Sequence, residues 1–310
     1  NGTRWNGDMK GRKGSTDEGG VRSPMLIRWP GKIEGGREIK QIGGAIDLLP
    51  TLADMAGIKV ASQKPLDGIS LKQFIQGEGA GDPDRVIFSH WRNRVSLRTQ
   101  THRLDHQGNL FDMEADPGQR TNIAPTRQEL TARLRKAQEK FKRDVVAGYD
   151  QDDRAFIIGH PDYKYTQIPA RDGTAHGNIK RSNKFPNCSF FTNWVSLEDK
   201  ITWTAEVGAS GKYQVELHYA CPKKDVGSTI ELNFNDASLL AKLTEAHDPP
   251  LRGHENDRVK RVESYVKDFK SVNLGTIELQ KGSGELTLKA LKIPGSQAME
   301  FRLLMLTRVK

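Results

Sequence analysis

The sequence predicts an α/β region with a small antiparallel sheet, followed by an all-β sandwich. Residues 45–56 and 130–145 carry apolar side chains at the three-to-four-residue spacing of helices. Residues 201–207 and 213–219 instead alternate between apolar and polar side chains, as strands with one buried face do. Between these regions, residues 149–184 are polar and irregular. The change of period across this segment indicates two different domains.

Composition and charge narrow the class of protein. The chain has 310 residues, of which 35% are hydrophobic and 28% charged, as in a folded protein with a polar surface. The net charge of +9 is spread over the chain, with +6 in residues 1–150 and +3 in the remainder. This charge predicts attraction to anions such as sulfated polymers. The sequence contains no basic helix or aromatic–basic motif that would indicate nucleic-acid binding, and no apolar run long enough to span a bilayer.

The first part of the chain, residues 1–80, has the pattern expected at the edge of an α/β sheet. Residues 25–29 are apolar and end at a Pro-Gly turn, which predicts a buried strand. Residues 45–56 predict a helix stopped by Gly57, and Ser70 is expected to cap a short helix that Gly77 ends.

Residues 81–148 predict a small antiparallel sheet followed by a helix. Short apolar runs at 86–88, 95–97 and 109–112 are joined by short loops, which favours antiparallel strands. Thr126 and Glu129 have the spacing of a capping box at the start of the helix. Apolar side chains then recur at helical spacing up to the region of Gly148, at positions Leu130, Leu134, Ala137, Phe141 and Val145.

We expect residues 149–184 to form a linker or a wrapping segment, and residues 185–310 to form the β-sandwich. Alternation places Trp203 and Tyr219 on the core-facing side of their strands. The two cysteines, Cys188 and Cys221, are not in a C-x-x-C pair, which argues against a zinc site. The sequence leaves two alternatives for them, a single disulfide or two free thiols.

A basic, glycine-rich stretch near the N-terminus invites comparison with phosphate-binding loops. In residues 10–16 (KGRKGST) the lysine precedes the glycine and no strand leads into the loop, so the Walker pattern fails. In isolation such a cluster is a solvated basic turn.

Four blocks together point elsewhere: residues 13–31, 47–57, 66–71 and 109–124, which include KGSTDEGGVRSP, DLLPTLA, LDGISL and NLFDMEADPG. In order and spacing they resemble the sulfatase family over roughly residues 1–146. Sulfatases hydrolyse sulfate esters and share an α/β superfamily with alkaline phosphatase. The resemblance implies that residues 1–148 are the C-terminal part of a sulfatase catalytic domain.

The resemblance also implies roles for individual residues. Lys13 occupies the place of a family lysine that contacts the substrate sulfate, where a cation stabilises the charge that develops as the ester breaks. Asn1 takes the place of a calcium ligand in an Asp-Asn-Gly turn, and an amide oxygen is a suitable ligand for Ca²⁺. Glu18 and Arg22 are interpreted as a structural ion pair.

Residues 88–94 (FSHWRNR) supply further candidates for substrate binding. His90, Trp91, Arg92 and Arg94 are residue types that suit sugars and anions, and the small sheet of this family contributes substrate contacts. Ordinary packing at a sheet edge is an equal alternative for His90 and Trp91.

The family nucleophile is a formylglycine made within a Cys-x-Pro-x-Arg type motif, which neither cysteine matches. The chain begins at Asn1 without a leader, so we expect a fragment or a processed chain that lacks the nucleophile and is inactive alone. Most calcium ligands would also lie outside it. The enzyme is expected to be periplasmic or extracellular.

The sandwich resembles accessory domains of the carbohydrate-binding-module type in residues 211–215, 219–222 and 275–288. The predicted function is hydrolysis of sulfate esters of carbohydrates or aryl compounds. The alternatives are a phosphodiester or phosphonate ester hydrolase of the same superfamily, and a non-catalytic carbohydrate-binding protein.

Overall fold

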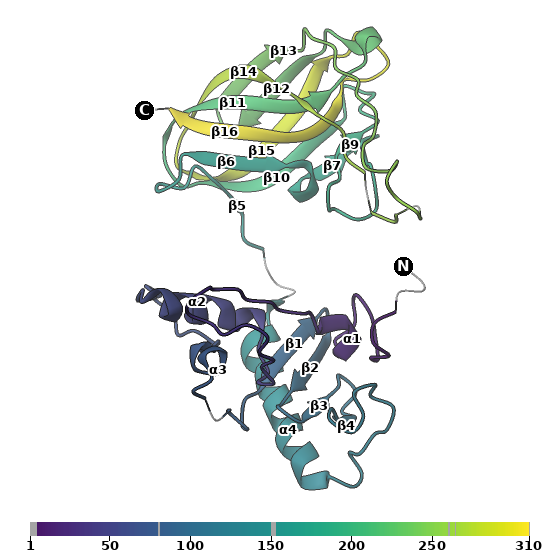
Figure 1. Cartoon of the computed structure of the whole chain (residues 1–310). Coiled ribbons are helices and arrows are strands. Elements are labelled where there is room, and N and C mark those ends of the chain that lie inside the picture. The colour runs from purple at the N-terminus through teal and green to yellow at the C-terminus, as the bar shows by residue number, and fades with distance from the viewer. Residues whose placement is uncertain (1–4, 80, 150–152, 260, 264, 310) are drawn as a thin grey trace. The chain divides into compact units, whose positions relative to one another are not determined.

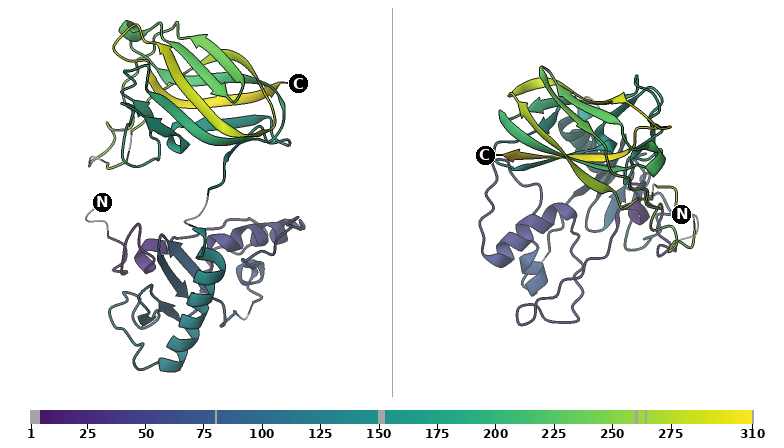
Figure 2. Two further views of the ribbon diagram at one scale, coloured as in Figure 1. Left: turned by 180° about the vertical axis from the view of Figure 1, so that it is seen from behind. Right: turned by 90° about the horizontal axis from the view of Figure 1, so that it is seen from above.

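The computed structural model divides the chain into two compact units (Figure 1, Figure 2). We call Asn1–Asp152 the N-terminal unit and Asp153–Lys310 the C-terminal unit. The structure describes residues 5–79, 81–149, 153–259, 261–263 and 265–309. Each unit is considered separately below.

The helices in the first part of the N-terminal unit are short. They are α1 (Glu18–Val21), the 3₁₀ turn η1 (Ala45–Asp47), α2 (Leu48–Ala56) and α3 (Lys72–Gln76). α2 ends where Gly57 adopts a left-handed φ of 67°, and α3 ends at Gly77 with a φ of 88°, so both predicted stops are confirmed.

The predicted cap at Ser70 is wrong in detail. The first residue of α3 is Lys72, and its cap residue Leu71 makes no side-chain hydrogen bond. The Ser70 hydroxyl instead donates to Asp54 at 2.6 Å and accepts the backbone N–H of Lys72 at 3.3 Å. Ser70 therefore ties the start of α3 to α2.

The strand predicted at residues 25–29 does not form in the described part of the chain. These residues have no regular structure, and their large apolar side chains are exposed, Leu26 to 97%. A strand requires a neighbour for its backbone hydrogen bonds, and no described strand pairs with this segment.

The small antiparallel sheet is confirmed, with strands in the order β1–β2–β3–β4. The strands are β1 (Ile87–Trp91), β2 (Arg94–Arg98), β3 (His102–Leu104) and β4 (Leu110–Asp112), of which β3 was not predicted. The helix α4 (Gln128–Phe141) packs on the sheet and continues into one π-helical turn, η2 (Lys142–Val146). Their shared core consists of the leucines Leu97, Leu104, Leu110 and Leu134.

The capping box predicted for α4 is absent. The Thr126 hydroxyl donates to the carbonyl of Ile123 at 3.0 Å instead of accepting from the helix, and the cap residue is Arg127. The predicted helix itself is confirmed, because Leu134 and its apolar neighbours have a core to pack against.

The C-terminal unit is a β-sandwich of two sheets. One sheet has the order β13–β12–β15–β10–β5 with β7 beside β10, and the other has the order β14–β11–β16–β9–β8 with β6 beside β16. The strands are β5 (Phe156–Ile158), β6 (Tyr165–Pro169), β7 (Thr174–His176), β8 (Lys180–Arg181), β9 (Phe191–Thr192), β10 (Lys200–Val207), β11 (Gly211–Ala220), β12 (Thr229–Phe234), β13 (Ala237–Lys242), β14 (Lys270–Leu279), β15 (Gly282–Lys292) and β16 (Glu300–Val309). Short 3₁₀ turns are η4 (Ala170–Asp172) and η5 (Lys223–Asp225).

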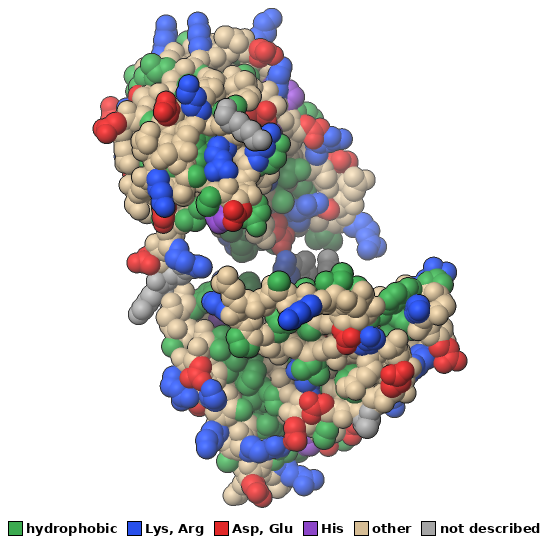
Figure 3. Space-filling model, turned by 90° about the vertical axis from the view of Figure 1, so that its left-hand side faces the viewer, with side chains coloured by type: hydrophobic (Ala, Val, Ile, Leu, Met, Phe, Trp, Pro, Cys, Tyr) green, Lys and Arg blue, Asp and Glu red, His purple; other side chains and the backbone are tan. Residues whose placement is uncertain are grey.

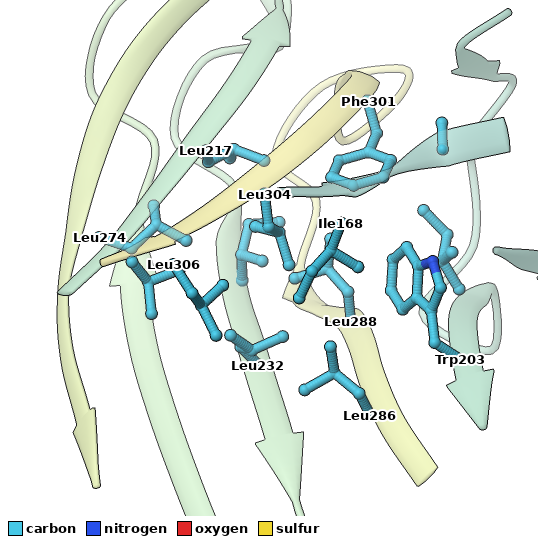
Figure 4. Packing of buried hydrophobic residues seen from close by; sticks show 14 of the residues in the cluster. Ile168, Trp203, Leu217, Leu232, Leu274, Leu286, Leu288, Phe301, Leu304 and Leu306 are labelled. Carbon is cyan, nitrogen blue, oxygen red and sulfur yellow. The ribbon is translucent and has the colours of Figure 1, made fainter. Parts of the chain in front are cut away.

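Inward-facing side chains of both sheets form one continuous core (Figure 4). Trp203 and Tyr219 are buried in it, as the alternation predicted, and so is Trp194. The ring of Trp203 meets Phe301 edge to face at 5.9 Å between centroids. These aromatic rings therefore stabilise the sandwich and are not available to stack on a ligand.

One feature of the core departs from the sequence pattern. Strict alternation from Phe301 predicts that Leu303 is buried, but the core contains Leu304 and Leu306. The pairing of β16 with β11 shifts register between His218 and Tyr219, which inserts one extra residue into β16. This β-bulge moves the following side chains to the opposite face.

The structure differs from the predicted boundary at residues 184/185. Strands β5 to β8 lie in the segment expected to be a linker or wrap, and they pair within the two sheets. The buried Asp199 carboxylate accepts the N–H groups of Asn178, Val195 and Ser196 at 2.7–3.0 Å, and so fastens this segment to the sandwich. The polar, irregular sequence of this segment did not predict these short strands, because their hydrogen bonds are made to strands that are distant in the sequence.

Both cysteines are free thiols, with Cys188 exposed and Cys221 buried. No helix in the described ranges has the length and apolarity required to cross a bilayer.

Candidate active-site loop and substrate hollow

The loop that carries Lys13 is packed tightly against α1, and two glycines permit this. A Cβ atom on Gly20 would lie 2.2 Å from the carbonyl oxygen of Ser15, and one on Gly19 would lie 2.5 Å from the amide nitrogen of Asn6. The N–H of Gly19 also donates to the carbonyl of Lys10 at 2.8 Å. The Gly-Gly pair is therefore required for close approach of backbone to backbone. We call residues 10–17 the lysine loop.

A buried ion pair fastens α1 to the small sheet. Glu18, 6% exposed, accepts two hydrogen bonds from the guanidinium of Arg103, 3% exposed, at 2.7 and 3.0 Å. The backbone N–H of Glu18 donates to the side chain of Gln119 at 2.8 Å. The predicted pair with Arg22 is present at 3.8 Å, but it is longer, and Arg22 lies at the surface. Arg103 is thus the partner that sequence reasoning missed.

The backbone of the lysine loop is also held from β2 and β3. The hydroxyl of Ser96 and the guanidinium of Arg103 both donate to the carbonyl of Thr16, at 2.6 and 3.0 Å. Lys10 forms an ion pair with the buried Asp105 at 3.3 Å and lies over the ring of Phe111. Lys10 therefore has a structural role. The contacts at Lys10 and at Thr16 hold the lysine loop in place near both of its ends.

A hollow of about 310 Å³ opens beside the lysine loop. It is lined by Gly14 and by residues 91–94, which form the tip of the β1–β2 hairpin. Trp91 is 52% exposed there, and Arg92 and Arg94 are also exposed. Three predicted binding residues, Trp91, Arg92 and Arg94, therefore line the same hollow. Gly14, the residue after Lys13, lines it as well. Asn93, which sequence reasoning did not select, also lines the hollow because it completes the turn.

The backbone at the hairpin tip is strained. Arg92 has a φ of 53°, in the left-handed region that glycine and asparagine occupy most readily. A left-handed conformation disfavours other residues by roughly 1–2 kcal/mol. Strain of this kind is found at functional sites more often than elsewhere.

His90 has a different position from its neighbours in sequence. Its Nε2 atom is hydrogen-bonded to the carbonyl of Arg92, and its ring meets Tyr149 edge to face at 5.6 Å. His90 does not line the hollow. It supports the hairpin tip, so its predicted direct contact with substrate has no support in this geometry.

The other sequence blocks have structural explanations. The buried Asp47 carboxylate accepts the N–H groups of Gly44 and Ile69 at 2.8 and 2.9 Å and pairs with Arg85. A Cβ atom on Gly68 would lie 1.9 Å from the carbonyl oxygen of Ile46. The blocks at 47–57 and 66–71 are therefore parts of one packing arrangement.

A second hollow of about 400 Å³ lies at the start of α4 and includes Asn122 and Arg135. Both side chains are already used, since Asn122 accepts the N–H of Leu110 at 3.1 Å and Arg135 donates to the carbonyl of Gly108 at 2.9 Å. None of the predicted site residues lines it.

The proposed calcium ligand Asn1 lies outside the described residues. Within the described ranges, no group of three or more His, Cys, Asp or Glu side chains is placed to hold a metal ion. The described His, Cys, Asp and Glu side chains therefore do not by themselves provide a donor set for Ca²⁺.

Comparison with known proteins identifies relatives of the N-terminal unit. Residues 13–144 match the family model described as N-sulphoglucosamine sulphohydrolase, C-terminal. An uncharacterized sulfatase, YdeN, of Escherichia coli is 37% identical over 97 residues, covering 30% of this chain and 17% of the relative. An N-acetylglucosamine-6-O-sulfatase of Bacteroides thetaiotaomicron is 30% identical over 160 residues, covering 44% and 27%. Arylsulfatase A of Bos taurus is 32% identical over 149 residues, covering 38% and 29%. The chain spans less than a third of the length of each.

Solved structures resemble parts of the chain at low overall scores. A family 35 carbohydrate-binding module from Clostridium thermocellum has a TM-score of 0.34 and 13% identity, covering 47% of this chain and 100% of that one. A Bacteroides thetaiotaomicron sulfatase structure has a TM-score of 0.39 and 20% identity, covering 44% and 32%.

Proposed function

We propose that this protein is part of a sulfuric ester hydrolase, from the premise that its residues 13–144 belong to the sulfatase family as a C-terminal part. The observation that carries the proposal is the anchored lysine loop beside the hairpin hollow. Relatives over this region are sulfatases of several kinds. The proposed activity also requires parts of the enzyme that lie outside residues 13–144.

Lys13 is proposed to stabilise the sulfate group in the transition state. The Lys10–Asp105 ion pair holds the chain before this residue, and the Ser96 contact at Thr16 and the buried Glu18–Arg103 pair hold it after this residue. A cation held by a rigid backbone stabilises developing negative charge without reorganisation. This is the chemistry that cleavage of a sulfate ester requires at the sulfate oxygens and the leaving oxygen.

Exposed apolar side chains support the idea that the N-terminal unit is part of a larger domain (Figure 3). Large residues along positions 25–58 are open to solvent: Met25, Leu26, Trp29, Leu48, Leu49, Leu52 and Ile58. Leaving one such side chain in water forgoes about 1.5–3 kcal/mol of stabilisation. We propose that a further part of the catalytic domain, outside these 310 residues, covers this surface.

The same outside part is proposed to supply the formylglycine nucleophile and most ligands of one Ca²⁺ ion. Neither Cys188 nor Cys221 lies in a motif for conversion to formylglycine, and both belong to the sandwich. A periplasmic or extracellular location is proposed for this enzyme.

The hollow beside the lysine loop favours a sulfated carbohydrate over a small aryl sulfate. Trp91 offers an exposed aromatic face, and Arg92 and Arg94 add two cations at the hairpin tip. An indole suits the apolar face of a sugar ring, and guanidinium groups suit further sulfate or carboxylate groups. The matching family model and one relative carry names that specify sulfated glucosamines, in keeping with this substrate class.

The test uses this chain together with the proposed remainder of the catalytic domain. Lys13→Ala should lower kcat on a sulfated substrate on the order of a hundredfold, since losing one such donor typically costs about 2.7–4 kcal/mol. Arg12→Ala is the matched control, because Lys10 is needed for the Asp105 ion pair. Equal, modest losses in both variants would show that the loop is only a basic surface.

A phosphodiester or phosphonate substrate is the main competing proposal within the superfamily. The two are separated by measuring release of sulfate and of phosphate from matched aryl esters. Faster phosphodiester cleavage by the complete enzyme would overturn the sulfatase assignment and leave the role of Lys13 intact.

A further inference from the structure

Two loops at one end of the sandwich are fastened to each other. The first joins β8 to β9, and the second is the long loop that joins β13 to β14. At their bases the buried ring of Phe190 meets Phe269 edge to face, with 5.2 Å between the centroids. Farther out, the side-chain amide of Asn183 donates to the carbonyl of Val262 at 2.8 Å. The two loops therefore project together from the sandwich beside β9 (Figure 1).

The long loop is also held by contacts within itself. The backbone N–H of Arg252 donates to the carbonyl of Val266 at 2.8 Å, which closes the neck of the loop. Nearer the tip, the guanidinium of Arg261 donates to the carboxylate of Asp257 at 2.7 and 3.1 Å and lies over the ring of Tyr265 at 4.6 Å. A loop ordered in this way loses less conformational freedom when it binds a partner.

Apolar side chains gather where the two loops meet. Val259 is 72% exposed, Val262 is 50% exposed and Phe185 is 38% exposed. Phe185 lies beside Val262 because its backbone N–H donates to the side chain of Asn183, which in turn binds the Val262 carbonyl. Exposed apolar residues are common singly, whereas a group of them indicates a surface that binds a partner. We call Phe185, Val259 and Val262 the apolar tip.

Each residue of the apolar tip directly follows a basic residue in the sequence: Lys184, Arg258 and Arg261. The ammonium group of Lys184 lies over the ring of Phe185, 5.1 Å from its centroid. Together, residues 183–188 and 257–263 carry four Lys+Arg and two Asp+Glu, which gives 4 − 2 = +2. The tip therefore combines exposed apolar side chains with positive charge.

From this arrangement we propose that the apolar tip inserts into the surface of a lipid membrane that contains anionic phospholipids. The apolar side chains enter the boundary between headgroups and acyl chains, while the basic side chains beside them remain at the level of the phosphates. Each such cation is attracted by the negative surface potential of the lipid. A soluble anionic polymer would pair with the same cations but leave the valines in water, so the apolar side chains favour lipid as the partner.

This membrane site does not depend on the sulfatase proposal, because all of its residues belong to the C-terminal unit. Its role would be to hold the enzyme at a membrane surface. The whole chain has a net charge of +9, so some attraction to any anionic surface is expected. Dependence on the apolar tip is therefore the property that distinguishes this proposal from attraction by charge alone.

Co-sedimentation of the complete 310-residue chain with phospholipid vesicles tests the proposal. One set of vesicles contains equal parts of phosphatidylglycerol and phosphatidylcholine, and the other contains phosphatidylcholine alone. The chain should sediment with the anionic vesicles and stay in solution with the neutral ones. Val259→Ser combined with Val262→Ser should lower vesicle binding about tenfold, equivalent to about 1.4 kcal/mol. Val259→Trp should raise it, because an indole suits the membrane interface.

Matched substitutions at the other end of β11 and β16 fix the location of the site. The long loop enters β14 at Lys270, which pairs with the last part of β11, whereas Val309 pairs with Lys212 at its first part. Val309→Ser removes a valine that is 45% exposed and should leave vesicle binding unchanged. Lys212→Gln removes an exposed cation and should weaken binding less than Arg258→Gln does.

Three results would each overturn the proposal. The first is that the chain does not sediment with the anionic vesicles. The second is vesicle binding that the two valine substitutions leave unchanged, which would assign the binding to net charge. The third is self-association that the same substitutions abolish, measured by analytical ultracentrifugation, in a chain that binds no vesicles. That result would make a second copy of the chain the partner of the apolar tip.

Discussion

The two units of this protein differ in how completely they bury their own apolar side chains. The sandwich closes a core that draws on both sheets, from Ile158 to Leu306. The N-terminal unit buries a cluster of four leucines and leaves residues such as Leu26 and Leu49 in solvent. The difference indicates that the sandwich is a self-sufficient domain, whereas the N-terminal unit relies more on polar anchors and leaves apolar side chains exposed.

Separate expression of the two units should show the largest contrast. Residues 153–310 should melt cooperatively with a β-type circular dichroism spectrum, because their core is complete. Residues 5–149 should bind a hydrophobic dye and melt with little cooperativity. Cooperative melting of both pieces, without dye binding, would contradict the comparison.

Loss of the buried pair in the N-terminal unit should have the next largest effect. Arg103→Ala leaves Glu18 buried without its main partner, and breaking such a pair typically costs about 3–5 kcal/mol. In the full chain, denaturant unfolding should show early loss of the N-terminal unit and an unchanged transition for the sandwich. Arg133→Ala, which removes an exposed arginine from α4, is the control and should be nearly neutral.

The two units should differ in how their stability changes at low pH, because the sandwich contains the buried carboxyl of Asp199. Burial opposes ionisation of this carboxyl, but hydrogen bonds from the N–H groups of Asn178, Ser196 and Val195 and from the Asn178 amide outweigh it, so its pKa is below the ordinary value of 3.8. A lowered folded-state pKa stabilises the sandwich above the unfolded-state pKa, and this contribution is lost as the pH falls through the folded-state value.

Asp199→Asn should therefore destabilise the sandwich at pH 7 by about 1.5–3 kcal/mol, the usual worth of hydrogen bonds to a charged group. The difference from the unmodified chain should shrink below about pH 4. Asp236→Asn, at an exposed turn, is the control. A pH-independent difference would assign the effect to packing and not to the charge.

The smallest expected effect concerns thiol reactivity, and it reports on closure of the sandwich. Burial raises the pKa of Cys221 to about 11, so almost no thiolate is present at pH 8. A disulfide reagent should label one thiol per native chain, at the exposed Cys188, and two in denaturant. Cys188→Ser should abolish the native labelling. Two labelled thiols in the native chain would show that the sandwich core opens readily.

Much of the candidate site was predictable from sequence because its residues are close in the chain. Trp91, Arg92 and Arg94 were selected from one short segment, and the hairpin brings them to one hollow with Gly14. His90 was selected with them, but it turns to the Arg92 carbonyl and Tyr149. Arg103 was not found, because its partner Glu18 is 85 residues away.

Taken alone, the sequence determined α2, α3 and α4, three strands of the small sheet, the sandwich and the core side of its long strands, since periodicity reports which face of an element is buried. Tertiary structure decided the rest. It recruited β5 to β8 into the sandwich, and it left residues 25–29 without a sheet. Through one inserted residue at Arg302 it moved Leu303 out of the core. Each of these outcomes depends on hydrogen bonds to a distant strand, which local pattern does not encode.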